Sequence, residues 1–187
     1  MRERPETFRS SGSLVFGAIT VAVALTLAVL AAVHPRAGAP AWLSAALVLF
    51  ALVVYVASMR PAVVLGDAEL VLRNMLSSVH VPWSLVGEVR VRQFLTVEAG
   101  DRTFDCAAVG RSRRQIHRDA RRLAETPVVN PAELSYGRFV ETKIRNRAEE
   151  ARRRPETPDH QVRVVRAWPE IVGLAAGAVT LVVLVLV

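Results

Sequence analysis

Cysteine and lysine are almost missing from this 187-residue chain, in which Cys106 is the single cysteine and Lys143 the single lysine. A lone cysteine excludes an intrachain disulfide and a metal site built from several cysteines of one chain. Its strand-like surroundings predict a buried or half-buried thiol. Arginine therefore carries almost all the positive charge of a chain with a formal net charge of +7. We attribute this usage to a GC-rich genome rather than to selection for arginine contacts.

The sequence also lacks the motifs that mark common catalytic and nucleotide-binding sites. It contains no Gly-x-Ser-x-Gly, no P-loop and no dinucleotide fingerprint. His80 and His117 have no second ligand at a metal-binding spacing, so a solvated or hydrogen-bonded histidine is expected at each. We therefore predict no enzyme activity, no cofactor and no metal ion.

Charge is absent from three apolar blocks, residues 14–33, 41–59 and 171–187. The first block spans roughly the 30 Å hydrocarbon core at about 1.5 Å per residue. Trp168-Pro169 precedes the last block and marks an interface. These blocks predict three transmembrane helices, and the first two form a hairpin. A cleavable signal peptide is the alternative for the first block, because Ala37-Gly38-Ala39 resembles a cleavage site.

Arginines in the short flanks predict the orientation of these helices. The N-terminal tail holds three arginines and Arg60 follows the second helix, whereas the loop between the helices holds only Arg36. Cytoplasmic flanks are rich in Lys and Arg, so both ends of the hairpin are expected in the cytoplasm. Arg163 and Arg166 place the start of the last helix on the same side, with the C-terminus outside the inner (plasma) membrane.

Small residues suggest where the membrane helices pack. Gly173 and Gly177 form a Gly-x-x-x-Gly, which favours a helix-packing face, although glycine is frequent in membrane helices in any case. On the first helix a small residue recurs every four positions, at Thr20, Ala24, Ala28 and Ala32. This stripe favours close approach of another helix, with the abundance of alanine as the alternative explanation.

Short β-branched runs separated by turn residues fill the region after the hairpin. They predict strands at about 62–65, 69–75, 79–83, 86–94, 94–98 and 102–107. Ala99-Gly100-Asp101 predicts a hairpin turn. The alternation Val89-Arg90-Val91-Arg92 predicts one buried and one solvated face. Trp83, next to Pro82, is expected to fill the core, with a partner-binding aromatic as the alternative.

Two helices are expected after these strands. Ser112 can cap a helix that runs to Glu125, and a second helix spans residues 132–154. The second helix carries an apolar stripe of Tyr136, Val140, Ile144, Ala148 and Ala151. The first helix has a basic face, made of Arg113, Arg114, Arg118, Arg121 and Arg122.

This basic face is the candidate site for lipid or partner binding. Residues 111–154 hold 13 basic and six acidic side chains, an excess equal to that of the whole chain. Four interpretations remain open: a solvated face beside an anionic membrane leaflet, a site for anionic lipid, a site for an acidic protein, and a site for nucleic acid. Nucleic acid is not expected, because no aromatic platform or recognition motif accompanies the charge.

The order of elements in residues 60–123 resembles the bacterial PH-domain membrane proteins of actinobacteria, the group that includes low molecular weight protein antigen 6. The matching residues are Arg60-Pro61, Leu70-Val71-Leu72-Arg73-Asn74, Val81-Pro82-Trp83-Ser84, Val89 and Gly100-Asp101, with the helix Arg113–Leu123 at the place of the family's closing helix. A PH fold implies seven strands and a C-terminal helix, and the sequence places six strands. The stretch 64–69 has two acids and no base, unlike the basic signature of inositol-phosphate-binding PH domains.

Together these features predict an α+β membrane protein with three transmembrane helices and a small PH-like antiparallel barrel or sandwich capped by a helix. The expected order is a disordered cytoplasmic tail (1–13), a transmembrane hairpin (14–59), a PH-like domain (60–126), an amphipathic basic helix with a linker (127–167) and a C-terminal transmembrane helix (168–187). The expected function is that of a non-enzymatic scaffold or accessory subunit at the cytoplasmic face. The expected partners are membrane lipids and an unknown membrane or cytoplasmic protein, with a homo-oligomer as a further option. The alternative function is an anionic-lipid sensor that uses the helix 112–125.

Overall fold

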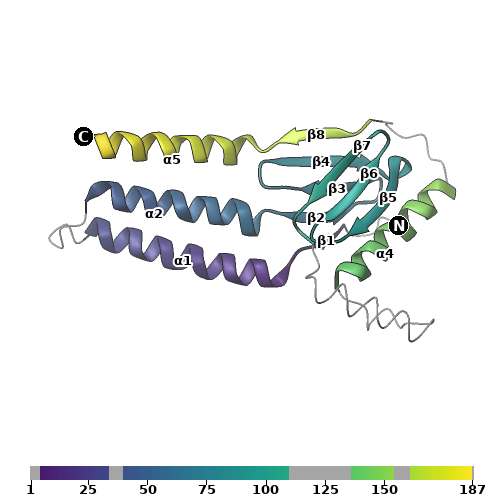
Figure 1. Cartoon of the computed structure of the whole chain (residues 1–187), viewed down its shortest axis with the longest axis horizontal. Helices are drawn as coiled ribbons and strands as arrows, with labels where there is room; N and C mark the ends of the chain where they lie inside the picture. The colour runs from purple at the N-terminus through teal and green to yellow at the C-terminus, as the bar shows by residue number, and fades with distance from the viewer. Residues whose placement is uncertain (1–4, 34–39, 110–135, 154–160, 187) are drawn as a thin grey trace. The chain divides into compact units, whose positions relative to one another are not determined.

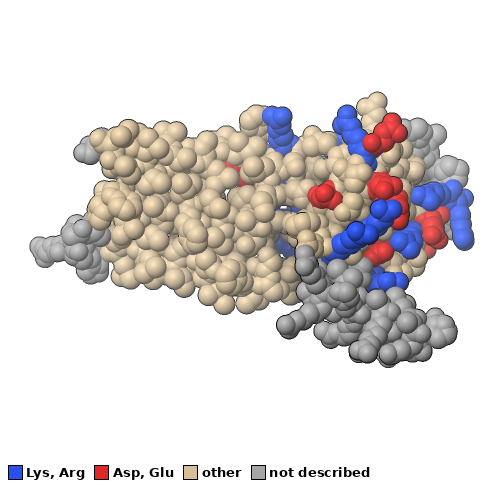
Figure 2. All heavy atoms as spheres, in the orientation of Figure 1, with Lys and Arg blue, Asp and Glu red and all other residues tan. Residues whose placement is uncertain are grey.

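The computed structural model describes residues 5–33, 40–109, 136–153 and 161–186, and the chain divides into two units (Figure 1). The strand unit comprises residues 1–10 and 61–165, and the helix unit comprises residues 11–60 and 166–187. On the face shown in Figure 2, Lys, Arg, Asp and Glu gather over the strand unit, whereas the surface of the helix unit is almost entirely uncharged. This division follows the uneven distribution of charge along the sequence.

Two antiparallel sheets form the strand unit. The first has the order β1-β2-β3-β4-β8, made of Glu6–Phe8, Ala62–Leu65, Glu69–Arg73, Ser77–Pro82 and Arg163–Arg166. The second has the order β5-β6-β7, made of Val86–Val91, Leu95–Ala99 and Arg102–Cys106. A short 3-10 helix, Trp83–Leu85, joins the two sheets after Pro82 ends β4. The prediction of an antiparallel β-rich module within an α+β chain is therefore confirmed.

Side-chain alternation places one face of each sheet in a shared core. In β5, Val89 and Val91 are buried while Arg90 is exposed, as is Arg92 just after the strand, in agreement with the sequence pattern. The predicted turn between β6 and β7 also forms, and Gly100 adopts a φ of 60°, a conformation in which a Cβ would be strained. The six strands predicted from the sequence are all present, with ends that shift by a few residues.

Residues 6–8 correct the expectation that the first 13 residues are a tail without regular structure. They form β1, which pairs with β2 from Glu6↔Leu65 to Phe8↔Val63. The sequence analysis also missed β8, which occupies the other edge of this sheet. β1 has only three residues, the sequence Arg-Val-Val-Arg of β8 does not alternate, and each of these strands is defined by a partner far away in the sequence.

Helix α4, Tyr136–Arg153, completes the core of the strand unit. Its side chains Val140, Ile144 and Ala148 belong to the same hydrophobic cluster as the inner faces of both sheets. The predicted stripe is therefore the packing face, although Tyr136 at its start is 47% exposed. The sequence analysis assigned this helix to a separate basic segment, whereas the structure makes it part of the fold. The other predicted helix, 112–125, lies outside the described residues.

Three apolar helices form the helix unit. They are α1 (Ser11–Val33), α2 (Ala41–Val54), which continues as the π-helical turn η2 (Tyr55–Met59), and α5 (Trp168–Leu186). Each stretch is long and apolar enough to cross a membrane. Within this unit α2 runs between α1 and α5 (Figure 1). The sequence prediction of three such helices is confirmed.

Candidate functional site

Small residues on α1 allow α2 to lie very close to it. A Cβ added to Gly17 would lie only 2.8 Å from the Cβ of Ser58, and Ala24 and Ala28 are buried. The Ser13 hydroxyl donates a hydrogen bond of 3.1 Å to the Ser58 carbonyl. Two residues of the predicted stripe thus belong to the packing face. The sequence analysis missed Gly17, although its spacing of seven residues from Ala24 puts both on one side of the helix.

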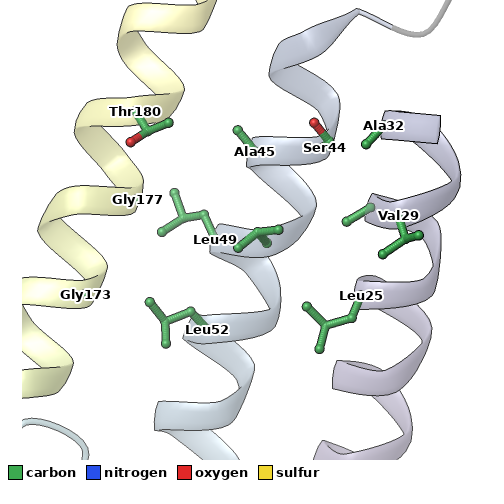
Figure 3. Close-up of a pocket in the computed structure, with 12 residues that line it drawn as sticks. Leu25, Val29, Ala32, Ser44, Ala45, Leu49, Leu52, Gly173, Gly177 and Thr180 are labelled. Atoms are coloured by element: carbon green, nitrogen blue, oxygen red, sulfur yellow. The ribbon is translucent and has the colours of Figure 1, made fainter. Parts of the chain in front are cut away.

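The predicted pair Gly173 and Gly177 faces α2 of the same chain. A Cβ on Gly173 would lie 3.4 Å from Leu52 Cδ2, and a Cβ on Gly177 would lie 3.1 Å from Leu49 Cδ1. In Figure 3, the two leucines point from α2 toward these glycines. The glycines therefore let α5 and α2 approach each other.

An open apolar groove of about 500 Å³ follows one face of α2 (Figure 3). Residues of α1 and α5 form its two sides, and most of its lining is aliphatic. The lining residues are Leu25, Ala28, Val29 and Ala32 of α1, Ser44, Ala45, Val48, Leu49 and Leu52 of α2, and Gly173, Gly177 and Thr180 of α5. We refer to this feature as the helix groove.

The two polar side chains in the helix groove are satisfied within their own helices. The Ser44 hydroxyl donates to the Ala41 carbonyl and the Thr180 hydroxyl donates to the Ala176 carbonyl, each at 2.9 Å. Seven of the twelve lining residues are Gly, Ala, Ser or Thr. The groove is therefore shaped by small side chains and offers packing surface rather than reactive groups.

An ion pair joins the ends of η2 and α5. Arg60 Nε lies 2.6 Å from Glu170 Oε1, and the two side chains are only 14% and 22% exposed. Glu170 stands in the first turn of α5, where a carboxylate also interacts favourably with the helix dipole. The sequence analysis missed this pair because 110 residues separate its members.

A second polar cluster connects three strands of the strand unit. His80 Nδ1 of β4 lies 2.7 Å from Glu69 Oε1 of β3, and the Arg163 guanidinium of β8 donates to Glu69 Oε2 at 3.3 Å. Both carboxylate oxygens are thereby used, and His80 is a hydrogen-bonded histidine. Within the described ranges, no group of three or more His, Cys, Asp and Glu side chains is arranged to hold a metal ion.

Part of the basic excess of the sequence serves the packing of α4. Arg145 and Arg152 donate hydrogen bonds of 3.3 Å and 2.6 Å to the carbonyl oxygens of Val89 and Val86 on β5. Lys143 pairs with Glu6 of β1 and lies over the Phe8 ring. Because β5 is an edge strand, the hydrogen bonds from Arg145 and Arg152 satisfy backbone carbonyl groups that would otherwise face solvent or a partner.

Trp83 and Cys106 are both buried in the strand unit. Trp83 is 3% exposed, and its indole N–H donates to the Gly66 carbonyl at 3.0 Å. Cys106 is completely buried, with Sγ 3.5 Å from the Arg73 carbonyl oxygen. Burial raises the pKa of the Cys106 thiol to about 11. Neither residue offers an accessible reactive or binding group.

The predicted basic face lies outside the described residues. Its members are Arg113, Arg114, Arg118, Arg121 and Arg122. Lipid sensing by the helix 112–125 therefore stays a prediction. No family model, curated protein or solved structure matches the chain. The resemblance to the bacterial PH-domain group thus stays an expectation, and the function has to be inferred from the geometry.

Proposed function

We propose that this chain is a non-enzymatic accessory subunit of the inner membrane, which presents a PH-like strand unit at the cytoplasmic face and receives a transmembrane helix of a partner protein in its helix groove. The observation that carries the proposal is the groove itself, an open apolar trough along α2 with small residues on all three contributing helices.

The lining of the groove favours a helix over a lipid chain. Lipid tails are as apolar as leucine, so apolar area alone does not drive association inside a bilayer. Close packing does, and it requires small residues that let backbones approach each other. Ala32, Ala45 and Gly177 come from three different helices and border the same trough. A partner helix with its own small residues would gain packing there that a fluid acyl chain would not.

Strand pairing supports the proposed topology independently of the arginine count. Two residues separate β1 from α1, two separate η2 from β2, and one separates β8 from α5. All three strands belong to one sheet, so their ends share one compartment. The hairpin must then start and end on the same side of the membrane, and α5 must start there too. The arginine-rich flanks assign that side to the cytoplasm.

The order of strands supports the PH-like assignment. A PH fold implies seven strands followed by a C-terminal helix, and β1 to β7 followed by α4 have this order. β1 supplies the strand that the sequence analysis did not place. The hairpin of α1 and α2 then occupies the connection between β1 and β2.

Site-specific photocrosslinking in native membranes tests the groove. The photoreactive amino acid benzoylphenylalanine replaces Val48, which lines the groove and is 50% exposed. The matched control places it at Val53, which lies on the same helix, is 47% exposed and does not line the groove. We expect a discrete adduct at position 48 that maps to a transmembrane peptide of another protein. The variant Ala45→Leu, which fills the groove, should abolish this adduct.

The other outcomes count against the proposal. An adduct at twice the mass of the chain would assign the groove to a second copy. Crosslinking to lipid alone would show that no helix occupies it. Equal adducts at positions 48 and 53 would mean that the contact is nonspecific.

A further inference from the structure

At one end of the five-stranded sheet, the strands connect to the apolar helices. Phe8, the last residue of β1, pairs with Val63, and Ala62, the first residue of β2, pairs with Arg73, the last residue of β3. Two residues separate β1 from α1, and two residues separate η2 from β2. The turn between β3 and β4 therefore lies at the same end of the sheet as the last residue of β1 and the first residue of β2. We call this end the proximal end.

β8 also runs toward the proximal end. Its first residue, Arg163, binds Glu69, which starts β3 at the opposite end of the sheet. Its last residue, Arg166, therefore lies at the proximal end, and a single residue separates it from α5. All three connections to the apolar helices thus leave the sheet at one end.

The turn at the proximal end has an apolar tip. Asn74 and Ser77 close it through a hydrogen bond of 2.8 Å from the Asn74 N–H to the Ser77 carbonyl. Between them, Met75 and Leu76 are 45% and 44% exposed, and neither belongs to the hydrophobic core. Turns in water are normally built from Gly, Pro, Asn, Asp and Ser. Two adjacent large apolar side chains at such a tip fit an environment that is less polar than water.

The surroundings of the tip match the headgroup layer of a bilayer. Arg73 and Arg166 are exposed at the proximal end, where their charges suit anionic lipid. Tyr136 is 47% exposed, and its hydroxyl accepts a hydrogen bond of 3.1 Å from the N–H of Arg9, two residues before α1. Tyrosine is enriched at membrane–water interfaces because its ring is apolar and its hydroxyl is polar.

We propose that the proximal end of the sheet is a membrane-contacting surface, with Met75 and Leu76 inserted at the boundary between headgroups and acyl chains and with Arg73 and Arg166 at lipid phosphates. The partner is a phospholipid surface. This inference rests on the membrane topology in the proposed function and adds a lipid contact made by the strand unit itself. It is independent of the basic face of residues 112–125.

Nitroxide labelling of the full-length chain in vesicles of phosphatidylcholine and phosphatidylglycerol tests the insertion. Leu76→Cys and, separately, Met75→Cys carry the label, and the buried Cys106 of the wild type serves as the blank. The matched control is Ala68→Cys, an exposed position in the turn between β2 and β3 at the opposite end of the same sheet. Val179→Cys on α5, where the native side chain is 64% exposed, reports on the membrane span.

Collision of each label with oxygen and with a water-soluble nickel chelate measures its depth. We expect a several-fold lower nickel collision rate and a higher oxygen collision rate at positions 75 and 76 than at position 68. If positions 75 and 76 behave like position 68 while position 179 has a lipid signature, the insertion is wrong and the membrane span stands. A water signature at position 179 would overturn the proposed topology and this inference with it.

Discussion

The buried thiol of Cys106 allows a quantitative test of the strand unit. Its side chain is completely buried, and burial raises the thiol pKa from an ordinary value of 9.0 to about 11. The thiolate is the reactive species, and each pKa unit changes its population about tenfold. At neutral pH the thiolate population of the folded chain is therefore about 100-fold below that of an exposed cysteine.

Labelling of the full-length chain in mild detergent should reflect this difference. We expect a soluble thiol reagent to modify Cys106 at least about 100-fold more slowly than an exposed cysteine, because burial hinders access in addition to lowering the thiolate population. The reference is Ala68→Cys in a Cys106→Ala background, since position 68 is exposed in the same unit. Full labelling after denaturation controls for loss of the thiol by oxidation.

The raised pKa also predicts how stability depends on pH. The folded chain holds the Cys106 proton more tightly than the unfolded chain, so this residue costs no stability below pH 9 and lowers the free energy of unfolding as the pH rises to about 11. A shift of two pKa units corresponds to about 3 kcal/mol. Cys106→Ala removes this dependence, which is measured as the difference between wild type and variant across that pH range.

Two results would refute this reasoning. Labelling of Cys106 at the rate of the exposed reference would show that the thiol is not in the core. Equal loss of stability between pH 9 and 11 in wild type and Cys106→Ala would show that the pKa of Cys106 is not raised.

Slow labelling of the native Cys106 thiol also has a practical consequence. Its failure to react with an impermeant reagent does not reveal on which side of the membrane it lies. Introduced cysteines at exposed positions are needed for that purpose.

Two further substitutions test the packing of each unit. Ile144→Ala removes a completely buried side chain of α4 and should lower the free energy of unfolding by about 2–5 kcal/mol. The control Glu150→Ala, on the exposed side of α4, should change this free energy by less than about 0.5 kcal/mol. Pulse proteolysis in detergent measures both. Gly17→Val should weaken the α1–α2 hairpin, because its Cβ would lie 2.8 Å from Ser58, while Gly12→Val has no atom within 4 Å and should leave thermal unfolding unchanged. Equal effects within either pair would contradict the packing described.

Local patterns were sufficient to predict the helices and strands whose sequences show a long uncharged run or a clear hydrophobic periodicity. Three uncharged blocks gave the helices α1, α2 and α5, and alternating valines gave strands such as β5. β1 and β8 were missed because neither has an alternating pattern of its own, and each depends on a partner distant in the sequence. The expected tail at the N-terminus was wrong for the same reason.

The candidate site was predicted only in part, because it depends on contacts between distant segments. The motif of Gly173 and Gly177 indicated a packing face, but not that the face meets Leu49 and Leu52 of the same chain. The helix groove arises only when three separate helices are assembled, so no stretch of sequence contains it. The basic excess of residues 111–154 also did not reveal that Arg145 and Arg152 donate to the backbone of β5.

In the proposed topology, the place of the apolar hairpin in the chain, between the paired strands β1 and β2, couples membrane insertion to folding. β1 precedes α1 and β2 follows α2, so the pairing of Phe8 with Val63 forms only when both ends of the hairpin have stayed on one side of the bilayer. A hairpin with its first helix in the wrong orientation would leave β1 and β2 in different compartments. β2 would then be the edge strand of the sheet, paired only with β3, and such exposed edges invite aggregation. If the proposed topology holds, completion of the sheet at β1 requires that α1 and α2 have been inserted in that orientation.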